Sequence, residues 1–379
     1  MARPAPPNAD LFPPGLPVYA AMGRTASGRA WLNGLPATVQ ALQEEWDLRL
    51  GAPLHGGSCS WVAPVELPDG GEAVLKVTWP HREAAGEAVA LRAWDGDGAV
   101  RLLRHDRERY ALLVERCTPG EQLDDSPLPP AERLLLAAGL LRGLWSAPAP
   151  PDGDLEQVAD VCAEWADMVE ERMARLRPGY DPGLVRLGAR LLRELPATAT
   201  REVVVHGDFN PGNVLSARRR PWLAIDPKPM VGDPGYDPWP LLEQIDAPFE
   251  HPDPRPALRD RFALVADALD EDPARLPAWA AARTVENALW CADHGDVPGG
   301  SEEMEVAGGV GGVGGGGGGG APRPPAVRVA ADAPLQLGRP RNRTAAPRPL
   351  RPGSHNLRRG PGPLVGRGRG TGSGGSAGV

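Results

Sequence analysis

Apolar positions in the first third of the chain predict a helix followed by β-structure. Residues spaced three or four apart form the apolar stripe of an amphipathic helix, namely Leu35, Val39, Leu42, Trp46 and Leu50. β-rich runs at 58–65 and 73–78 flank a Pro-Asp-Gly-Gly turn at 68–71, the pattern of a hairpin. A helix over 82–94 and a buried strand over 110–115 follow.

From residue 130 onward the pattern becomes mainly helical, which places a domain boundary soon after Glu115. The predicted helices cover 131–146, 155–177, 182–195, 237–246, 255–270 and 273–293. One β-rich insertion interrupts them, with strands at 203–206, 214–216 and 222–226. A small β-rich lobe followed by a larger helical lobe is an α+β two-lobe arrangement.

The predicted domains follow these changes of pattern. A loose N-terminal segment covers 1–29, an N-lobe covers 30–117, and a C-lobe covers 118–306. The remaining 307–379 form a tail that is predicted to be disordered, because 22 of the 72 residues from Gly308 onward are Gly and 10 are Pro. Such a segment buries too little apolar surface to offset its ordering entropy.

Charge separates the tail from the rest of the chain. The tail holds eleven Arg, no Lys and one Asp, so residues 1–306 carry a net charge of -18 out of a total of -8. A basic Gly/Arg tail suits a nucleic-acid-binding arm, but its composition is also that of GC-rich DNA translated in the wrong frame, and we favour the second interpretation. The acidic body is a poor candidate for binding nucleic acid and suits a cationic ligand.

Cysteines and hydropathy indicate the compartment. Four widely spaced cysteines show neither a C-x-x-C motif nor a disulfide scaffold; they are Cys59, Cys117, Cys162 and Cys291. No apolar run approaches the roughly 20 residues of a membrane span, and the Pro-rich start lacks the blocks of a signal peptide. We expect a cytoplasmic monomer that does not contact a membrane.

Lysine is rare enough in this chain to draw attention to each position. Only Lys76 and Lys228 are lysines among 41 basic residues. Lys76 interrupts an apolar strand, where an ammonium group is costly unless it is paired. In kinases a lysine at this place holds the α- and β-phosphates of ATP. A surface lysine on an edge strand is an equal alternative from position alone.

The octapeptide at 206–213, His-Gly-Asp-Phe-Asn-Pro-Gly-Asn, carries the strongest signal. It places Asn213 five residues after Asp208, the spacing of the kinase catalytic loop, whose Asp accepts the substrate hydroxyl proton and whose Asn holds magnesium. Ordinary turn chemistry of Asx, Gly and Pro is the alternative. Thirteen residues later Asp226 ends a strand, where kinases place a second magnesium-binding Asp.

Four further acids have possible supporting roles. Lys76 needs a carboxylate partner from the following helix, and of Glu83 and Glu87 we favour Glu87 because it sits deeper among apolar residues. Either acid could instead be solvated on the helix surface. Asp233 and Asp237 follow the second hairpin and could be helix caps or turn residues, and Asp233 could instead support the loop.

In this order, the motifs resemble those of the aminoglycoside phosphotransferases, and most closely the aminoglycoside/hydroxyurea resistance kinases that include the streptomycin kinases. The resemblance covers about Ala30 to Val306, and the segments that carry it are 204–215, 224–229, 231–234 and 283–290. It implies a protein-kinase-like two-lobe fold and ATP-dependent phosphorylation of a hydroxyl of streptomycin. The Asp226-Pro227-Lys228 tripeptide departs from the D-F-G motif, so the Phe-based switch is absent.

The resemblance also implies roles for individual residues. Asp208 matches the catalytic base, Asn213 and Asp226 match the magnesium ligands, and Lys76 matches the phosphate-holding lysine. The linker around Glu115 and Cys117 falls where backbone groups meet adenine, and the loop around Ser58 would cover the phosphates although it lacks G-x-G-x-x-G.

The sequence specifies the acceptor molecule less closely than it specifies the residues for ATP and magnesium. Streptomycin bears two guanidinium groups that an acidic body attracts, and the acids that could contact them are Asp160, Glu164, Asp167, Glu170, Glu171, Glu286 and Asp293. A solvated helical face is the simpler interpretation of these acids. Hydroxyurea, another aminoglycoside or a metabolic alcohol are alternative acceptors. A catalytically dead binding module with a nucleic-acid-binding tail is an alternative of another class.

Overall fold

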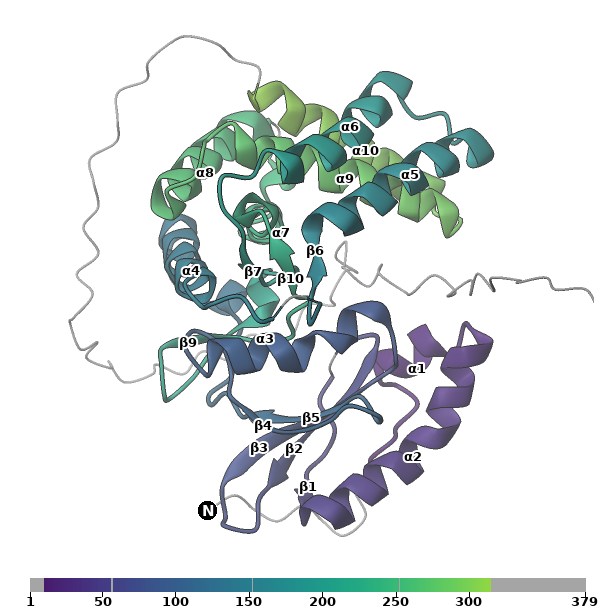
Figure 1. Ribbon diagram of the computed structural model, residues 1–379, viewed down its shortest axis with the longest axis vertical. Coiled ribbons are helices and arrows are strands. Elements are labelled where there is room, and N and C mark those ends of the chain that lie inside the picture. The colour runs from purple at the N-terminus through teal and green to yellow at the C-terminus, as the bar shows by residue number, and fades with distance from the viewer. Residues whose placement is uncertain (1–9, 56, 152, 252, 315–379) are drawn as a thin grey trace, which may run out of the picture.

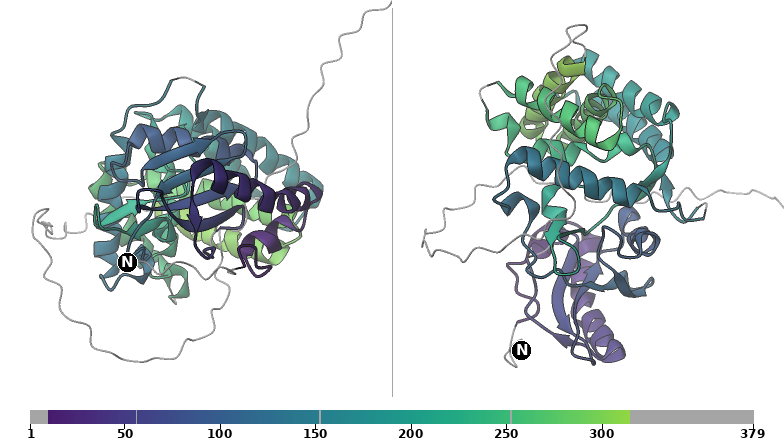
Figure 2. Two further views of the ribbon diagram at one scale, coloured as in Figure 1. Left: turned by 90° about the horizontal axis from the view of Figure 1, so that it is seen from below. Right: turned by 90° about the vertical axis from the view of Figure 1, so that its left-hand side faces the viewer.

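The computed structural model describes residues 10–55, 57–151, 153–251 and 253–314. They form two lobes, one built around a sheet and one mainly helical, which lie one above the other in Figure 1 and in the right-hand view of Figure 2. The α+β two-lobe arrangement predicted from the sequence is confirmed.

The N-lobe is built on a five-stranded sheet in the order β1-β2-β3-β5-β4, in which every neighbouring pair is antiparallel. Its strands are β1 (Arg49–Leu50), β2 (Ser60–Glu66), β3 (Glu72–Thr78), β4 (Leu102–Asp106) and β5 (Ala111–Glu115). The predicted hairpin joins β2 to β3, with Gly70 at φ +81° in its turn. Glycine adopts this left-handed conformation without steric cost.

The two faces of this sheet have different partners. Leu75 and Val77 pack in one apolar cluster with Leu35 and Leu42 of helix α2 (Ala26–Trp46). Because successive side chains of a strand alternate in direction, Lys76 lies on the other face. There helix α3 (Glu87–Trp94) lies between the sheet and the C-lobe (Figure 1). The alternation therefore directs the lysine of β3 toward the interlobe side.

The C-lobe is a helical assembly with small strands beside the lobe junction. Its helices are α4 (Pro130–Trp145), α5 (Val158–Leu176), α6 (Pro182–Ala197), α7 (Trp239–Gln244), α8 (Pro254–Leu269), α9 (Arg275–Asp293) and α10 (Val297–Gly314). Its strands are β6 (Glu156–Gln157), β7 (Val203–Val205), β8 (Val214–Ser216), β9 (Trp222–Ala224) and β10 (Met230–Gly232). They form a β6-β10-β7 sheet and a β8-β9 hairpin.

Backbone hydrogen bonds join the lobes at strand β9. The Ala224 nitrogen donates to the oxygen of Gly98 at 2.9 Å, and the Val100 nitrogen donates to the oxygen of Ala224 at 3.1 Å. In the β8–β9 turn, Arg219 donates to both carboxylate oxygens of Glu115 at 2.8 Å. These contacts fix the hairpin that carries Asp226 against the end of β5.

Both ends of the packed body differ from the sequence expectation. The predicted loose segment 1–29 contains helix α1 (Pro17–Met22) and the start of α2, while its first nine residues lie outside the described part. Helix α10 continues to Gly314, so the boundary placed after residue 306 falls inside a helix. Ala307 and Val310 are fully buried in the main core. Most of the predicted disordered tail, 315–379, lies outside the described residues.

Burial of the Ala307 and Val310 side chains in the main core explains this continuation. Near the start of α10, the lack of a side chain at Gly300 lets the backbone approach α9 closely, since a Cβ there would lie 2.6 Å from the backbone oxygen of Ala288. Tertiary packing therefore overrides the poor helix propensity of the Gly-rich sequence. None of the described helices combines the length and apolarity that crossing a bilayer requires.

Candidate active site

The lysine of β3 forms a buried ion pair with helix α3. Lys76 Nζ lies 2.7 and 2.6 Å from the two carboxylate oxygens of Glu87, and both residues are less than a tenth exposed. Glu87 is the partner that the sequence favoured over Glu83. A buried charge is tolerated when it is paired and hydrogen-bonded, so this arrangement resolves the cost of a lysine inside an apolar strand.

Asp226 joins this pair from the C-lobe. Its Oδ1 lies 2.5 Å from Lys76 Nζ and 2.8 Å from Lys228 Nζ. It follows β9 with φ +54°, a left-handed backbone that Asp tolerates better than most side chains. Burial opposes ionisation of Asp226, but the two ammonium groups outweigh it and hold the pKa of the carboxyl well below its usual range. The carboxylate is therefore negative throughout the neutral pH range.

The loop at 206–213 is organised by its own asparagines. Asn210 Oδ1 accepts hydrogen bonds from the nitrogens of Gly212 and Asn213, and its Nδ2 lies 3.1 Å from Asp208 Oδ1. Asn213 Nδ2 donates to the Asp208 backbone oxygen at 2.9 Å. The backbone oxygen of Asn213 accepts from the nitrogen of Ile225, the residue before Asp226. The segments that carry Asp208, Asn213 and Asp226 are therefore linked directly.

A buried carboxylate holds the start of this loop. Asp237 accepts hydrogen bonds from the backbone nitrogens of His206 at 2.8 Å and Gly207 at 2.7 Å, and from Trp145 Nε1 at 2.9 Å. Burial raises the pKa of Asp237 to about 6, although these three donors oppose the increase. The sequence indicated a cap or turn residue at Asp237 and possible loop support from Asp233, whereas in the structure Asp237 is the residue that holds the loop.

Asp233 has a different structural task. Its carboxylate caps Gly235 and accepts hydrogen bonds from Arg275 and from Trp279 Nε1 at 2.6 Å. These partners anchor the segment after β10 to helix α9. Asp233 therefore stabilises the C-lobe and has no hydrogen bond to the catalytic loop among the described residues.

His206 is a core residue. It is fully buried, stacks on Trp94 and contacts the ring edge of Phe209. Burial lowers the pKa of His206 to about 4, so the imidazole is neutral at pH 7. Its Nε2 lies 3.0 Å from the backbone oxygen of Ile225, which links the loop to the strand that leads to Asp226.

The predicted nucleotide-covering segments are the Ser58 loop and the linker after β5. Cys59, beside Ser58, feels the charges of Lys228 and Asp226, while burial raises the pKa of its thiol. Glu115 ends β5, and its side chain is occupied by Arg219. Burial raises the pKa of the neighbouring Cys117 thiol to about 12, which makes it a poor nucleophile. The contact of adenine with backbone groups of this linker stays a prediction.

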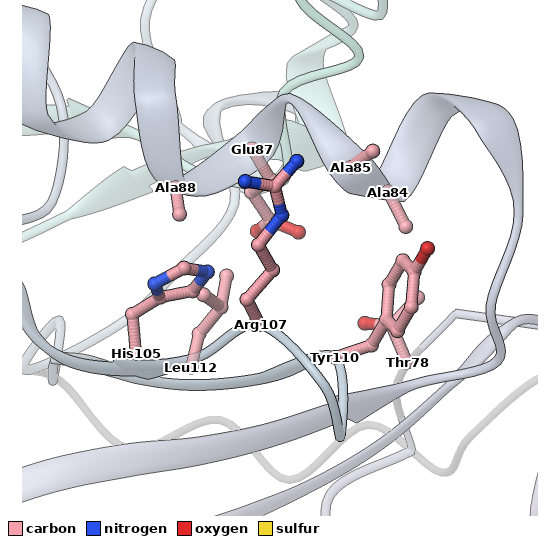
Figure 3. Close-up of a pocket in the computed structure, with 9 residues that line it drawn as sticks. All are labelled: Thr78, Ala84, Ala85, Glu87, Ala88, His105, Arg107, Tyr110 and Leu112. Carbon is pink, nitrogen blue, oxygen red and sulfur yellow. The ribbon is translucent and has the colours of Figure 1, made fainter.

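A separate pocket of about 70 Å³ lies in the N-lobe beside Glu87 (Figure 3). Its wall is formed by α3, the preceding turn and the β4–β5 region, with Thr78, Ala84, Ala85, Glu87, Ala88, His105, Arg107, Tyr110 and Leu112. Glu87 is the one residue that this pocket shares with the Lys76 ion pair. Neither Asp208 nor Asp226 lines it.

Most acids considered for the acceptor are engaged by arginines. Asp167 and Glu170 bind Arg193, and Glu171 and Asp293 bind Arg175. The pairs involving Glu164 and Glu286 are with Arg82 and Arg172. This face of the C-lobe is therefore largely self-neutralised.

A different pair of acids lies near the catalytic loop. Glu243 of α7 interacts electrostatically with Glu303 of α10 and with Asp208. Burial and the charge of Glu303 raise the pKa of Glu243 to about 7, while Arg283 opposes this increase. No sequence motif marks Glu243, because its acidic neighbour Glu303 lies on α10, a helix that was not predicted.

The donor set suits magnesium. Asp226 and Asn213 offer a carboxylate and an amide oxygen, and hard oxygen donors are what Mg²⁺ prefers, with phosphate oxygens and water completing its shell. Within the described ranges, no group of three or more His, Cys, Asp or Glu side chains converges as a metal-binding cage. Such a site needs the nucleotide to complete it, as in kinases.

Comparison with known proteins identifies the family of this site. The profile of the family described as "Aminoglycoside/hydroxyurea antibiotic resistance kinase" matches residues 45–295. The chain belongs to this kinase family. It is a small-molecule phosphotransferase, as the order of its motifs predicted.

Two curated relatives are about equally similar. The streptomycin 6-kinase of Streptomyces griseus is 38% identical over 291 residues, which cover 75% of this chain and 91% of the relative. The hydroxyurea phosphotransferase of Kitasatospora aureofaciens is 38% identical over 283 residues, covering 74% and 80%. The aligned regions leave out about a quarter of this chain in each case.

A solved structure confirms the fold. A thermostable mutant of aminoglycoside phosphotransferase APH(4)-Ia, solved with ADP and hygromycin B, aligns with a TM-score of 0.51 at 18% identity. The alignment covers 73% of this chain and 99% of that protein. The protein-kinase-like fold predicted from the sequence is therefore confirmed.

Proposed function

We propose that this protein transfers the γ-phosphoryl group of ATP to a hydroxyl of an aminoglycoside, with streptomycin as the favoured acceptor. The transfer inactivates the antibiotic by adding a bulky, doubly charged group to it. Asp208 accepts the hydroxyl proton, and Lys76, held by Glu87, contacts the phosphates of ATP. Asn213 and Asp226 hold Mg²⁺, which supplies charge neutralisation at the phosphates when it is bound.

One observation carries this proposal. Asp208 lies on a loop that is hydrogen-bonded to the strand end of Asp226, and Asp226 in turn meets the Lys76–Glu87 pair of the other lobe at 2.5 Å. Base, metal ligands and phosphate-binding cation therefore converge at one place although they are up to 150 residues apart in the chain. Phosphoryl transfer depends mainly on such positioning and on electrostatic stabilisation.

The acceptor follows from charge and similarity together. The 38% identity to a streptomycin 6-kinase supports streptomycin. The body carries a net charge of -18, and Glu243 with Glu303 places acidic charge near Asp208. Guanidinium groups bind carboxylates in charge-assisted, often bidentate hydrogen bonds. We propose that this acid pair attracts the cationic acceptor toward the catalytic base.

Hydroxyurea is the second candidate acceptor. The observation that favours it is the equal identity, 38%, to a hydroxyurea phosphotransferase. Hydroxyurea is small and uncharged, so it gains nothing from the acid pair near Asp208. The two acceptors therefore predict different effects of neutralising Glu243.

We further propose a cytoplasmic monomer that binds neither membranes nor nucleic acid. The surplus of negative charge in residues 1–306 supports the second point, since phosphates are repelled by such a surface.

The test is phosphate transfer from γ-labelled ATP with magnesium to three acceptors in parallel, namely streptomycin, hydroxyurea and a deoxystreptamine aminoglycoside. We expect labelled streptomycin and little label on the other two. Glu243→Gln should weaken the reaction with streptomycin and leave any transfer to hydroxyurea unchanged. Label on hydroxyurea alone would replace the first candidate with the second.

A further inference from the structure

Both lysines of the chain meet at one carboxylate oxygen. Lys76 and Lys228 lie 2.5 and 2.8 Å from Asp226 Oδ1, and every other basic residue apart from histidine is arginine. Lysine carries a compact charge with rotatable donors, whereas arginine presents a planar fork. The two positions where this chain uses lysine are thus the two that face the proposed magnesium ligand.

The two ammonium groups are not equivalent. Lys76 has three N–H donors, and three carboxylate oxygens lie within hydrogen-bond distance of its nitrogen, two from Glu87 and one from Asp226. Its side chain is 10% exposed. The Lys228 ammonium group, by contrast, hydrogen-bonds to Asp226 alone among the described residues, and its side chain is 20% exposed. Lys228 therefore retains donor capacity on a more open side of the cluster.

The backbone of Lys228 is fixed to the catalytic loop. Its nitrogen donates to the oxygen of His206 at 2.7 Å, and its own oxygen packs so closely on Gly207 that a Cβ there would lie 1.9 Å away. Buried prolines at 227 and 229 flank it and restrict φ on both sides. Lys228 is therefore held relative to the two residues that precede Asp208.

Lys228 lies between the loop that carries the base and the proposed metal ligand, because its backbone nitrogen donates to His206 and its ammonium group donates to Asp226. Arg283, another cation near this loop, donates to the backbone oxygens of Tyr236 and Gly207 and stacks on the Tyr236 ring. Beside Lys76, Lys228 is therefore a second cation placed to act on substrate.

We infer that Lys228 is a further catalytic residue, which donates hydrogen bonds to the phosphoryl group as it passes from ATP to the acceptor. This inference rests on the proposed function for the direction of transfer. A magnesium ion held by Asp226 would compete with both ammonium groups for this carboxylate. Lys76 would keep Glu87 as a partner, whereas Lys228, which has no second carboxylate among the described residues, would be free to donate to the phosphate oxygens.

In the transfer step one bond to phosphorus forms and one breaks. An electron pair of the acceptor hydroxyl oxygen forms the new bond to the γ-phosphorus, and the bond from that phosphorus to the bridging oxygen breaks, leaving its electron pair on ADP. The hydroxyl proton goes to Asp208. Lys228 exchanges no proton and compensates the negative charge on the equatorial oxygens of the transferring group, where a fixed cation lowers the barrier most.

The experiment compares Lys228→Met, which removes the charge at similar length, with Lys228→Arg, which keeps a cation. Arg190→Met, at an exposed position of α6, controls for loss of positive charge. Each variant is assayed for kcat and for the KM of ATP. Calorimetry then measures the affinity for MgADP with and without aluminium fluoride, a mimic of the transferring phosphoryl group, and thermal unfolding reports integrity.

We expect Lys228→Met to lower kcat by about a hundredfold or more, a typical loss for one such electrostatic group, with the KM of ATP changed less than about threefold. Aluminium fluoride should tighten MgADP binding in wild type but not in Lys228→Met, and Lys228→Arg should recover part of both. Arg190→Met should match wild type.

Two results would overturn the inference. One is a Lys228→Met variant that keeps kcat within about threefold of wild type. The other is a variant that binds MgADP with aluminium fluoride as tightly as wild type does. Because the calorimetric comparison needs no acceptor, it tests Lys228 even if wild type phosphorylates none of the proposed acceptors.

Discussion

The carboxylate of Asp237 lies 2.7 Å from the backbone nitrogen of Gly207, the residue before the proposed catalytic base. Its other oxygen accepts hydrogen bonds from His206 and Trp145. A fully buried side chain 30 residues downstream therefore sets the start of the catalytic loop. The position of Asp208 depends on this contact.

Asp237→Asn tests that dependence. Asparagine keeps the shape but has one acceptor oxygen, and its amide group would face an N–H donor. We expect a loss of about 3 kcal/mol in the free energy of unfolding, because a buried donor loses its partner. The measurement is urea denaturation, with Asp160→Asn on the exposed face of α5 as the matched control. Equal stability of both variants would contradict the role of Asp237.

The C-terminal boundary gives a second prediction. A chain that ends at Gly314 should unfold at the same temperature as the full chain, because it keeps all of α10. A chain that ends at residue 306 loses the buried side chains of Ala307 and Val310, and we expect it to be about 2 kcal/mol less stable. Thermal unfolding of the two truncations decides this. Equal stability of the two truncated chains would show that the folded C-lobe ends at residue 306, as the sequence predicted.

The raised pKa of Glu243 leads us to expect that the affinity for the acceptor depends on pH. With a pKa of about 7, Glu243 gains negative charge as the pH rises through neutrality. The affinity for cationic streptomycin, measured by calorimetry without nucleotide, should therefore rise between about pH 6 and 8. Glu243→Gln should bind more weakly at the upper end and lose this part of the rise. An unchanged profile in the variant would remove Glu243 from the acceptor site.

Glu243 also affects the free energy of unfolding, which should fall with rising pH, whereas the affinity for streptomycin should rise. Its pKa is raised from 4.5 to about 7 in the folded protein, so between these values the folded state binds more protons than the unfolded state. The contribution of Glu243 to the free energy of unfolding therefore falls as the pH rises through this range. Urea denaturation at several pH values should show this slope in wild type and a weaker one in Glu243→Gln.

The sequence predicted the fold well where local pattern and packing agree. The 3.6-residue period in α2 and the alternation in β2 and β3 are set by burial on one face, so both were readable. Strand β4 was missed because its side chains are mostly half-exposed or exposed, and β10 has only three residues. Leu50, assigned to the first helix, lies in β1 because Asp47 ends α2 with φ +52°.

The residues of the site also fall into a group that the sequence predicted and a group that it did not. Lys76, Glu87, Asp208, Asn213 and Asp226 stand in short motifs or at readable strand and helix positions, and the structure brings them together. Asp237, Glu243 and Arg219 have no local signature, because their partners are 30 or more residues away and become neighbours through the fold alone. Such residues follow from tertiary contacts rather than from sequence spacing.

The most direct test of the central claim uses Asp208→Asn. Wild type and variant are given γ-labelled ATP, magnesium and streptomycin, and MgADP affinity is measured in parallel by calorimetry. We predict labelled streptomycin from wild type, a turnover about 100- to 10,000-fold lower in the variant, and MgADP affinity nearly unchanged. A variant that transfers phosphate at the wild-type rate, or a wild type that binds MgADP but labels no acceptor hydroxyl, would contradict the account.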